Sequence, residues 1–387
     1  MWRGLTALWQ PGTATASFRA AVIESTGSGN CHLMDTGRGA LVVILKGLRS
    51  LANRRQVIVP AYSCPTVVQS VIEAGLEPIL CDVSVRTLDL DREALISLIS
   101  DEVLAIVPTH LYGLAHDVRD LLEIGHQHDI FVIEDAAQAF GARLDGKMVG
   151  TFGDAGMYSL GRGKCIPVGH GGVIVSRGYC SAAILEAIQE TICDGTHMDV
   201  GSLVLFAGYG VATHPRVWWL TVRTPLNPAD HGMDLDELAP IRLHHLSAVQ
   251  AALGNSILER LEAYQSSSRR NARRLMAGLA EFDGVSFPEI PSGAEPVYLR
   301  LPVLVEDEHH AIRLFDLLEQ EGIGVSRSYW RSLPDLYSRI LLSDERDFPG
   351  AARLARCLLT LPTHTYLQEQ DLTRIQRAFA RFANEGG

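Results

Sequence analysis

The 387-residue sequence lacks several features that mark common classes of protein. Its seven cysteines include no Cys-x-x-Cys pair, and an odd number does not suit a framework of disulfides. The first residues lack a basic start followed by an apolar core, so we expect no secretory signal. No uninterrupted apolar run is long enough to span a membrane. These absences favour a globular protein of the cytoplasm.

Positive charge is also scarce, because 34 Lys and Arg face 45 Asp and Glu and give a net charge of -11. This balance argues against a nucleic-acid-binding protein, which normally carries a basic face. The sequence contains no His-Glu-x-x-His motif and no Cys/His quartet. The adjacent pairs His244-His245 and His309-His310 do not converge on one ion. We therefore expect no metal site.

One segment, Val200–Val222, is unusually apolar, although His214, Pro215 and Arg216 interrupt it. We expect a buried or interface-covering insertion, with a contact to a membrane surface or a partner as the alternative.

Short β-branched runs alternate with helical patterns between residues 40 and 176, which is typical of βαβ units and a mainly parallel sheet. Asp145-Gly146 marks one hairpin turn within this region. A helical pattern over Leu246–Leu279 is expected to lead into a smaller unit. We predict an α/β fold with a large domain over 1–240 and a linking helix plus small C-terminal α+β domain over 241–387. The candidate strands are Val57–Val59, Ile79–Asp82, Leu104–Pro108, Ile130–Glu134 and Val173–Ser176 in the large domain, with Val297–Val303 and Gly324–Ser326 in the small one.

The stretch "MYSLGRGKCIPVGHGGVIV" places Lys164 in a glycine-rich turn. A phosphate-binding loop requires the spacing GxxxxGK[ST], but Tyr158 replaces its first glycine and Cys165 follows the lysine. A GxGxxG fingerprint is also missing after the first candidate strands, so an NAD enzyme is unsupported. The alternative is a lysine that forms a Schiff base with pyridoxal phosphate.

Pyridoxal phosphate needs an amine, a carboxylate at its ring nitrogen, a phosphate cradle and a neighbour for its ring hydroxyl. Asp135 follows the strand Ile130–Glu134, where ligands of parallel sheets bind. Gln138 is expected one helical turn further on. Taken alone, Asp135 is equally a helix cap, Gln138 a surface residue and Ser159 a turn residue. Their combination with Lys164 favours a shared cofactor.

These residues fall in blocks that occur in order over most of the chain. With them, the sequence resembles the DegT/StrS-type sugar aminotransferases, a family of fold-type I pyridoxal phosphate enzymes. The resemblance implies a large domain with a mainly parallel seven-stranded sheet, and a homodimer whose active sites are shared between subunits. The matching blocks are "DTGRGAL", "VIVPAYSCPTVVQSVIEAGLEPILCDV", "IVPTHLYGLAHDV", "VIEDAAQAFGARLDGKMVGTFGDAGMYSLGRGKCIPVGHGGVIVS", "AVQAALGNSILERLE" and "LLTLPTHTYLQEQDL".

The resemblance also implies roles for single residues. Lys164 would carry the Schiff base and then shuttle a proton, while Asp135 would pair with the ring nitrogen. Gln138 would contact the ring oxygen. Ser159 and the backbone of Gly37 and Arg38 would hold the phosphate at a helix N-terminus, where free amides and the dipole favour an anion.

The sequence departs from the family pattern in the residues around the cofactor. Arg38 replaces a threonine, His170 replaces an acidic residue, and Cys64 stands where an aromatic often stacks on the ring. Tyr62 is then the candidate for stacking. The family's Asn-Tyr-Arg, which contributes to the neighbouring subunit's site, aligns with Leu243-His244-His245. The candidate substrate contacts are Arg162, Arg242, His244, His245 and Arg327.

The predicted reaction is a two-stage transamination. An amino acid, with glutamate as the expected donor, would leave the cofactor as pyridoxamine phosphate, and a keto-sugar linked to a nucleotide would take the amine. The pathway would make a polysaccharide, another glycan or a secondary metabolite. The alternatives are a non-nucleotide keto substrate, a sugar dehydratase, and a non-catalytic regulator or assembly protein that keeps the fold. The retained Lys164 favours transamination, because the family's dehydrating members replace it with histidine.

Overall fold

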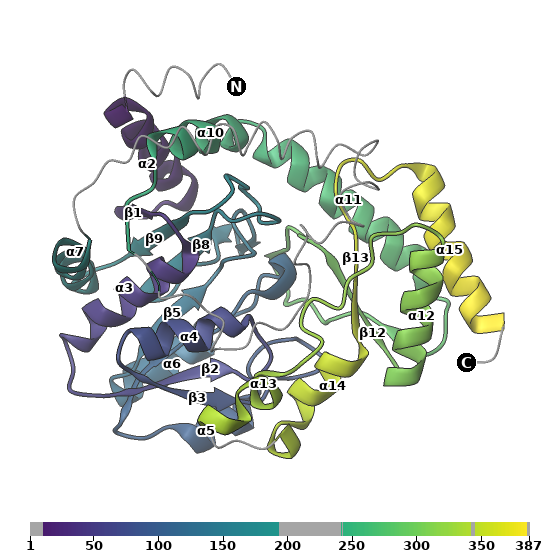
Figure 1. Cartoon of the computed structure of the whole chain (residues 1–387), viewed down its shortest axis with the longest axis horizontal. Helices are drawn as coiled ribbons and strands as arrows, with labels where there is room; N and C mark the ends of the chain where they lie inside the picture. Colours follow the sequence, from purple (N-terminus) through teal and green to yellow (C-terminus); the bar gives the residue numbers. More distant parts are fainter. Residues whose placement is uncertain (1–10, 193–240, 242, 342–344, 385–387) are drawn as a thin grey trace.

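The computed structural model describes residues 11–192, 241, 243–341 and 345–384. The apolar segment 200–222 and Arg242 lie outside the described residues. Figure 1 shows a sheet-containing body built from the first half of the chain, and α11 (Leu261–Leu279) leading away from it to the C-terminal elements. No helix of the described ranges combines the length and apolarity needed to cross a membrane.

A seven-stranded sheet forms the centre of the body, with the strand order β1-β9-β8-β5-β4-β2-β3. β9 is antiparallel to both of its neighbours, and every other adjacent pair is parallel. The predicted mainly parallel sheet is therefore confirmed. The strands are β1 (Asn30–Met34), β2 (Gln56–Pro60), β3 (Glu77–Cys81), β4 (Val103–Ile106), β5 (Phe131–Asp135), β8 (Ala155–Ser159) and β9 (Gly172–Ser176).

Helices cover both faces of this sheet because successive strand residues point to opposite sides. Val57 and Val59 of β2 belong to the core that includes α3 (Gly37–Arg49) and α4 (Pro65–Glu73). Ile58, between them, belongs to the core on the other face, under α5 (Arg92–Leu98) and α6 (Arg119–His128). Each of these three residues is fully buried. Strands buried on both faces explain the near-continuous apolar runs in the sequence.

Three more helices lie around the β1 end of the sheet. α2 (Pro11–Thr26) packs against α10 (Ala248–Leu258), and α7 (Cys180–Thr191) packs against α3. Phe18 of α2 is completely buried, and a Cβ on Gly254 of α10 would come within 2.5 Å of its ring. Gly254 therefore permits the close approach of the two helices.

The hairpin predicted at Asp145-Gly146 is confirmed. It joins β6 (Arg143–Leu144) to β7 (Lys147–Met148), which pair in antiparallel register. Asp145 and Gly146 have φ values of 49° and 77°, as a turn with two left-handed residues requires. β11 (Ala294–Glu295) adds a third strand beside β6.

The single helix predicted over Leu246–Leu279 is wrong, because the structure has two helices there. Ser247 begins α10 with a capping box that it shares with Gln250. The chain then leaves the helix at Arg260, where φ is -115°, and restarts as α11. The boundary predicted near residue 240 adjoins undescribed residues and stays a prediction.

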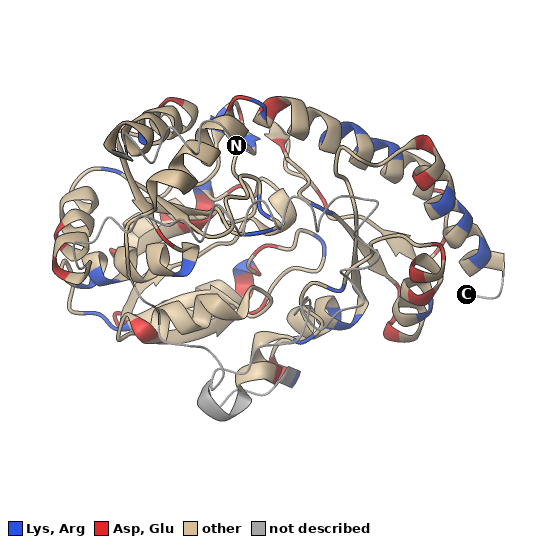
Figure 2. Cartoon of the chain, turned by 45° about the horizontal axis from the view of Figure 1, so that its top comes forward, with Lys and Arg blue, Asp and Glu red and all other residues tan. Residues whose placement is uncertain are grey.

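The C-terminal part contains a second, antiparallel sheet with the strand order β10-β12-β13. Of the strands predicted here, β12 begins at Leu301, and Ser326 forms only an isolated bridge to Thr360. In Figure 2 both signs of charge occur along α11 and α15, and Arg274 of α11 pairs with Glu369 of α15. The elements are β10 (Val285–Ser286), β12 (Leu301–Val305), α12 (Glu308–Gln320), α13 (Leu333–Leu341), α14 (Pro349–Cys357), β13 (Leu358–Leu361) and α15 (Glu369–Asn384).

Candidate active site

A cavity of about 260 Å³ opens where β5 and β8 end and α3 begins. This is the carboxyl edge of the parallel strands, where open α/β sheets bind ligands. Six residues that the sequence singles out for a cofactor line the cavity together: Gly37, Arg38, Asp135, Gln138, Ser159 and Lys164.

Asp135 is the last residue of β5 and is 4% exposed. Its Oδ1 accepts a hydrogen bond from the Ala137 amide at 3.0 Å, and its Oδ2 has no hydrogen-bond partner in the described part of the chain. Burial raises the pKa of Asp135, while the Ala137 amide and the Lys164 charge act in the opposite direction. A buried carboxylate that faces a cavity with one oxygen available is suited to a protonated ring nitrogen.

Glu134, immediately before Asp135, is a second buried carboxylate that the sequence analysis missed. His110 Nε2 lies 3.0 Å from Glu134 Oε2, and both side chains are 0% exposed. Because His110 Nδ1 accepts the His116 amide, the ring proton lies on Nε2 and is donated to Glu134. Backbone amides of residues 150, 152 and 153 also donate to Glu134. Burial alone would raise the pKa of Glu134, but these hydrogen bonds lower it.

The start of α3 forms a cradle for an anion. Thr36 is the N-cap and accepts the Gly39 amide at 3.0 Å, which leaves the first two amides of the helix pointing outward. A Cβ on Gly37 would lie 3.1 Å from Ser159 Oγ, so the helix start and Ser159 are in contact. Arg38 donates to Gln69 Oε1 at 3.0 Å. This arrangement fits a phosphate group.

Gln138 lies in a turn and not in the helix that its spacing suggests, because the chain turns after β5 with a hydrogen bond from Ala139 to Ala136. Its side chain is fixed at both ends. Gln138 Oε1 accepts the Tyr112 amide at 2.8 Å, and Nε2 donates to Tyr329 Oη at 2.8 Å. Tyr112 has a φ of 56°, a left-handed conformation that turns its amide toward the glutamine.

Among the described aromatic residues, Tyr329 lines the cavity and Tyr62 does not. Tyr62 is 1% exposed, and its hydroxyl lies 3.1 Å from that of Tyr112. The Tyr329 ring stands edge-on to Tyr62, with 5.7 Å between the ring centroids. Tyr329 also lines the cavity beside Cys64. Sequence reasoning missed it, although it follows Arg327 by only two residues.

The four candidate substrate contacts that the structure describes do not line the cavity. Arg162 is exposed in the turn before Lys164. His244 accepts the Asp35 amide through its carbonyl at 2.9 Å, and His245 is exposed beside Met34 of β1. Arg327 donates to the carbonyl of Ala355 at 3.3 Å. Arg242 lies outside the described residues.

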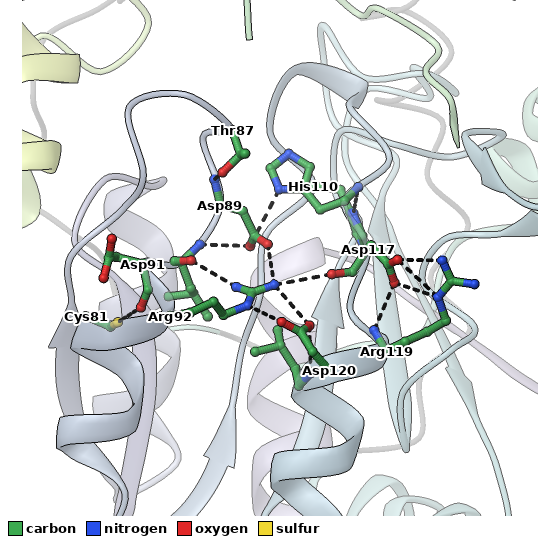
Figure 3. A network of polar contacts seen from close by, with 12 residues as sticks. Cys81, Thr87, Asp89, Asp91, Arg92, His110, Asp117, Arg119 and Asp120 are labelled. Atoms are coloured by element: carbon green, nitrogen blue, oxygen red, sulfur yellow. Dashed lines mark hydrogen bonds and ion pairs between the residues drawn. The ribbon is translucent and has the colours of Figure 1, made fainter. Parts of the chain in front are cut away.

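An ionic network holds the loop that carries His110 and Tyr112 (Figure 3). Arg92 bonds Asp89 at 2.9 Å and Asp120 at 2.5 Å. His116 Nδ1 lies 3.5 Å from Asp89 Oδ1. Burial alone would raise the pKa of Asp89, but His116 and Arg92 lower it to about 2. No group of three or more metal-ligating side chains gathers within the residues that the structure describes.

A model of the DegT/DnrJ/EryC1/StrS aminotransferase family matches residues 5–209 and 240–380. The chain therefore belongs to this family, as its sequence blocks predict. Among curated relatives, GDP-perosamine synthase of Caulobacter vibrioides is 26% identical over 94% of this chain and 88% of its own. UDP-N-acetyl-3-dehydro-alpha-D-glucosamine 3-aminotransferase of Acidithiobacillus ferrooxidans is 26% identical over 89% and 82%.

The fold matches solved sugar aminotransferases over nearly the whole chain. A putative sugar aminotransferase of Streptococcus pneumoniae, solved in its pyridoxamine phosphate form, has a TM-score of 0.79 at 18% identity and covers 100% of this chain and 97% of its own. The predicted class, a pyridoxal phosphate-dependent aminotransferase of fold type I, is confirmed. The cavity fits that cofactor, because it combines an amine, a buried carboxylate and an anion cradle.

Proposed function

We propose that the protein transfers an amino group from an amino acid, with glutamate as the donor, to a keto-sugar that is linked to a nucleotide. The product would enter a polysaccharide, another glycan or a secondary metabolite. The observation that carries this proposal is the meeting of Lys164 and Asp135 in one cavity beside the first amides of α3.

The cofactor would supply the reactive groups, and the residues of the chain would bind and orient it. When bound, pyridoxal phosphate supplies an aldehyde that exchanges with amines and a ring that accepts an electron pair. Asp135 would hold a proton on the ring nitrogen, because its buried carboxylate has no cation in hydrogen-bond contact among the described residues. Ser159 and the amides of Gly37 and Arg38 would bind the phosphate. Gln138, fixed at both ends, would face the ring oxygen.

Lys164 would act first as the covalent anchor and then as the base. The incoming amine would displace Lys164 from the cofactor. The free Nζ would then take the proton from the substrate Cα and return a proton to the cofactor carbon that carries the nitrogen. Burial raises the pKa of Asp135, and the charge of Lys164 acts to lower it. A lysine at this position supports transamination over dehydration, since its amine provides the proton transfer that amino exchange needs.

The relatives' names support the sugar substrate. The Caulobacter and Acidithiobacillus proteins are named for nucleotide-linked sugars, and a Streptomyces lividus relative that is 29% identical over 71% of this chain is named for glutamine and a deoxy-inosose. A nucleotide-linked keto-sugar is therefore the first class to test. A keto-cyclitol without a nucleotide is the second class, and glutamine is the alternative donor.

We also propose a cytoplasmic homodimer with shared sites. Each described cysteine is a free thiol, which suits a reducing compartment. His245 is exposed and pairs with β1 next to the start of α3, so a second copy at this surface would lie near the cavity. Sedimentation of the purified protein would show the dimer, and a monomer that retains full activity would contradict shared sites.

The reaction is tested by spectroscopy in two stages. The protein loaded with pyridoxal phosphate should show the visible band of the lysine-linked cofactor and lose it when glutamate or glutamine is added. A panel of nucleotide-linked keto-sugars and keto-cyclitols should then restore the band only with the true acceptor. A protein that stays colourless with added cofactor would overturn the enzyme assignment, and a band that no donor removes would overturn transamination.

A further inference from the structure

We infer that His170 is the hydrogen-bonding contact for both substrates at the mouth of the cavity, and that its Nε2 makes the contact. This inference rests on the proposed transamination and concerns how one site accepts two different substrates. His170 lines the cavity in the turn between Lys164 and β9, and its side chain is exposed.

The backbone of His170 is held by a buried residue of the helix that follows the large sheet. Gln250 is 1% exposed and donates through Nε2 to the His170 carbonyl at 2.7 Å. Gln250 is itself fixed by the capping box that begins α10. The turn that carries the imidazole is therefore anchored to a helix, and the ring sits at a defined place at the cavity mouth.

The Nδ1 atom of His170 lies between a hydrogen-bond acceptor and a donor. The Asp35 carbonyl oxygen is 3.0 Å away and Gln250 Nε2 is also 3.0 Å away. When Nδ1 carries the proton, it donates to the carbonyl, and when it does not, it accepts from the amide. In either tautomer Nδ1 therefore has a hydrogen-bond partner, and the ring does not have to move.

The consequence appears at the other ring nitrogen. Nε2 makes no hydrogen bond to the residues that the structure describes. It presents a lone pair in one tautomer and an N–H in the other. A ring that changes between acceptor and donor in place suits a site that receives an amino acid with a carboxylate in one stage and a hydroxylated keto-sugar in the next.

The other charged groups that line the cavity are already committed. Asp135 and Lys164 serve the cofactor in the proposed function, and Arg38 is bonded to Gln69 beside the phosphate cradle. Among the acidic, basic and imidazole side chains of the described lining, His170 is the one left for the substrates.

Two substitutions separate this contact from a structural role. His170→Asn places an amide near the position of Nδ1 and loses Nε2, whereas His170→Gln carries a donor and an acceptor to the position of Nε2. His126→Asn, at an exposed histidine of α6, is the matched control. Each stage is measured alone, as the single-turnover conversion of the pyridoxal form by the donor and of the pyridoxamine form by the acceptor.

We expect all three variants to keep the cofactor band and the melting temperature of the unaltered protein. His170→Asn should raise the half-saturating concentration of donor and acceptor about 5- to 100-fold, as the loss of one hydrogen bond to a charged or polar group implies, and His170→Gln should recover most of it. The inference is overturned if His170→Asn leaves both half-saturating concentrations unchanged, or if it changes that of the donor or of the acceptor only. If the unaltered protein converts no donor at all, the proposed function fails instead.

Discussion

The floor and the mouth of the cavity are built in opposite ways. On the floor, Asp135 and Gln138 are at most 9% exposed and are bonded by backbone amides. Glu134, next to Asp135 on β5, does not line the cavity but is buried and bonded in the same way. At the mouth, His170 is exposed on a turn, and Arg162 is exposed on the same turn region outside the described lining. The floor is organised before any ligand arrives and determines the chemistry, whereas the mouth leaves hydrogen-bonding groups open and determines which molecule is accepted.

The largest expected effect concerns Lys164. Lys164→Ala removes the anchor and the base, so the visible band should disappear and the single-turnover rate with the donor should fall by at least about 10²- to 10⁴-fold. Added methylamine should restore part of the rate, because it returns an amine to an otherwise intact floor. A variant that retains the band would show that another amine anchors the cofactor.

Glu134→Gln tests how much the buried support next to the floor contributes to folding. A glutamine turns an NH₂ group toward backbone amides that need an acceptor, so the free energy of unfolding should drop by about 1–3 kcal/mol. Urea denaturation of the two proteins measures this. Glu123→Gln on the exposed side of α6 is the control and should stay within about 0.5 kcal/mol. An equally small change for Glu134→Gln would contradict the role of the buried pair.

Asp135→Asn should slow the reaction while the cofactor stays bound. The neutral amide cannot hold a proton on the ring nitrogen, and the loss of one charged hydrogen bond corresponds to a rate decrease of about 10- to 150-fold. Single-turnover absorbance measures the rate, and Asp101→Asn at an exposed turn serves as control. A rate equal to that of the unaltered protein would remove Asp135 from the proposed mechanism.

Acid should weaken the loop network that holds His116 and Arg92 around Asp89. The pKa of Asp89 is lowered from 3.8 to about 2, so its contribution of about 2 kcal/mol is present above pH 4 and is lost as the pH falls toward 2. The free energy of unfolding, measured by urea denaturation, should therefore change less between pH 5 and pH 2 for Asp89→Asn than for the unaltered protein. An equal change in the two proteins would contradict this role of Asp89.

Tyr329→Phe should have the smallest effect. It removes the oxygen that accepts from Gln138 and leaves the Tyr112 contact of that side chain intact. We expect cofactor affinity to fall about 2- to 10-fold in a titration of the apoprotein. Tyr366→Phe, at an exposed tyrosine, should leave it unchanged, and equal affinities for all three proteins would show that Gln138 does not depend on Tyr329.

The predictability of the fold depended on side-chain type. Runs such as Val57–Val59 and Val173–Ser176 are β-branched and were predicted as strands, whereas β1 reads "NCHLM" and β8 reads "AGMYS". Their pairing with β9 makes these two segments strands. The break before Leu261 was missed for a related reason, since the sequence around it contains good helix formers.

In the site, the structure brings together those predicted residues that spacing along the chain already places close to one another. Asp135, Ser159 and Lys164 lie on neighbouring strand ends and their turns. Tyr329 and the pair of His110 with Glu134 depend on the tertiary fold, which local patterns do not encode. For the same reason Arg162 and Arg327, chosen for their charge, and His244 and His245, chosen by alignment with the family's Asn-Tyr-Arg, lie outside the described lining.

The hydrogen bond between Gln138 and Tyr329 also orders events during synthesis. It joins residues 191 positions apart. After Gln138 has been synthesised, nearly half of the chain must therefore still be added before Tyr329, its second hydrogen-bond partner, is present. A chain that lacks the C-terminal elements therefore holds Gln138 through the Tyr112 amide alone.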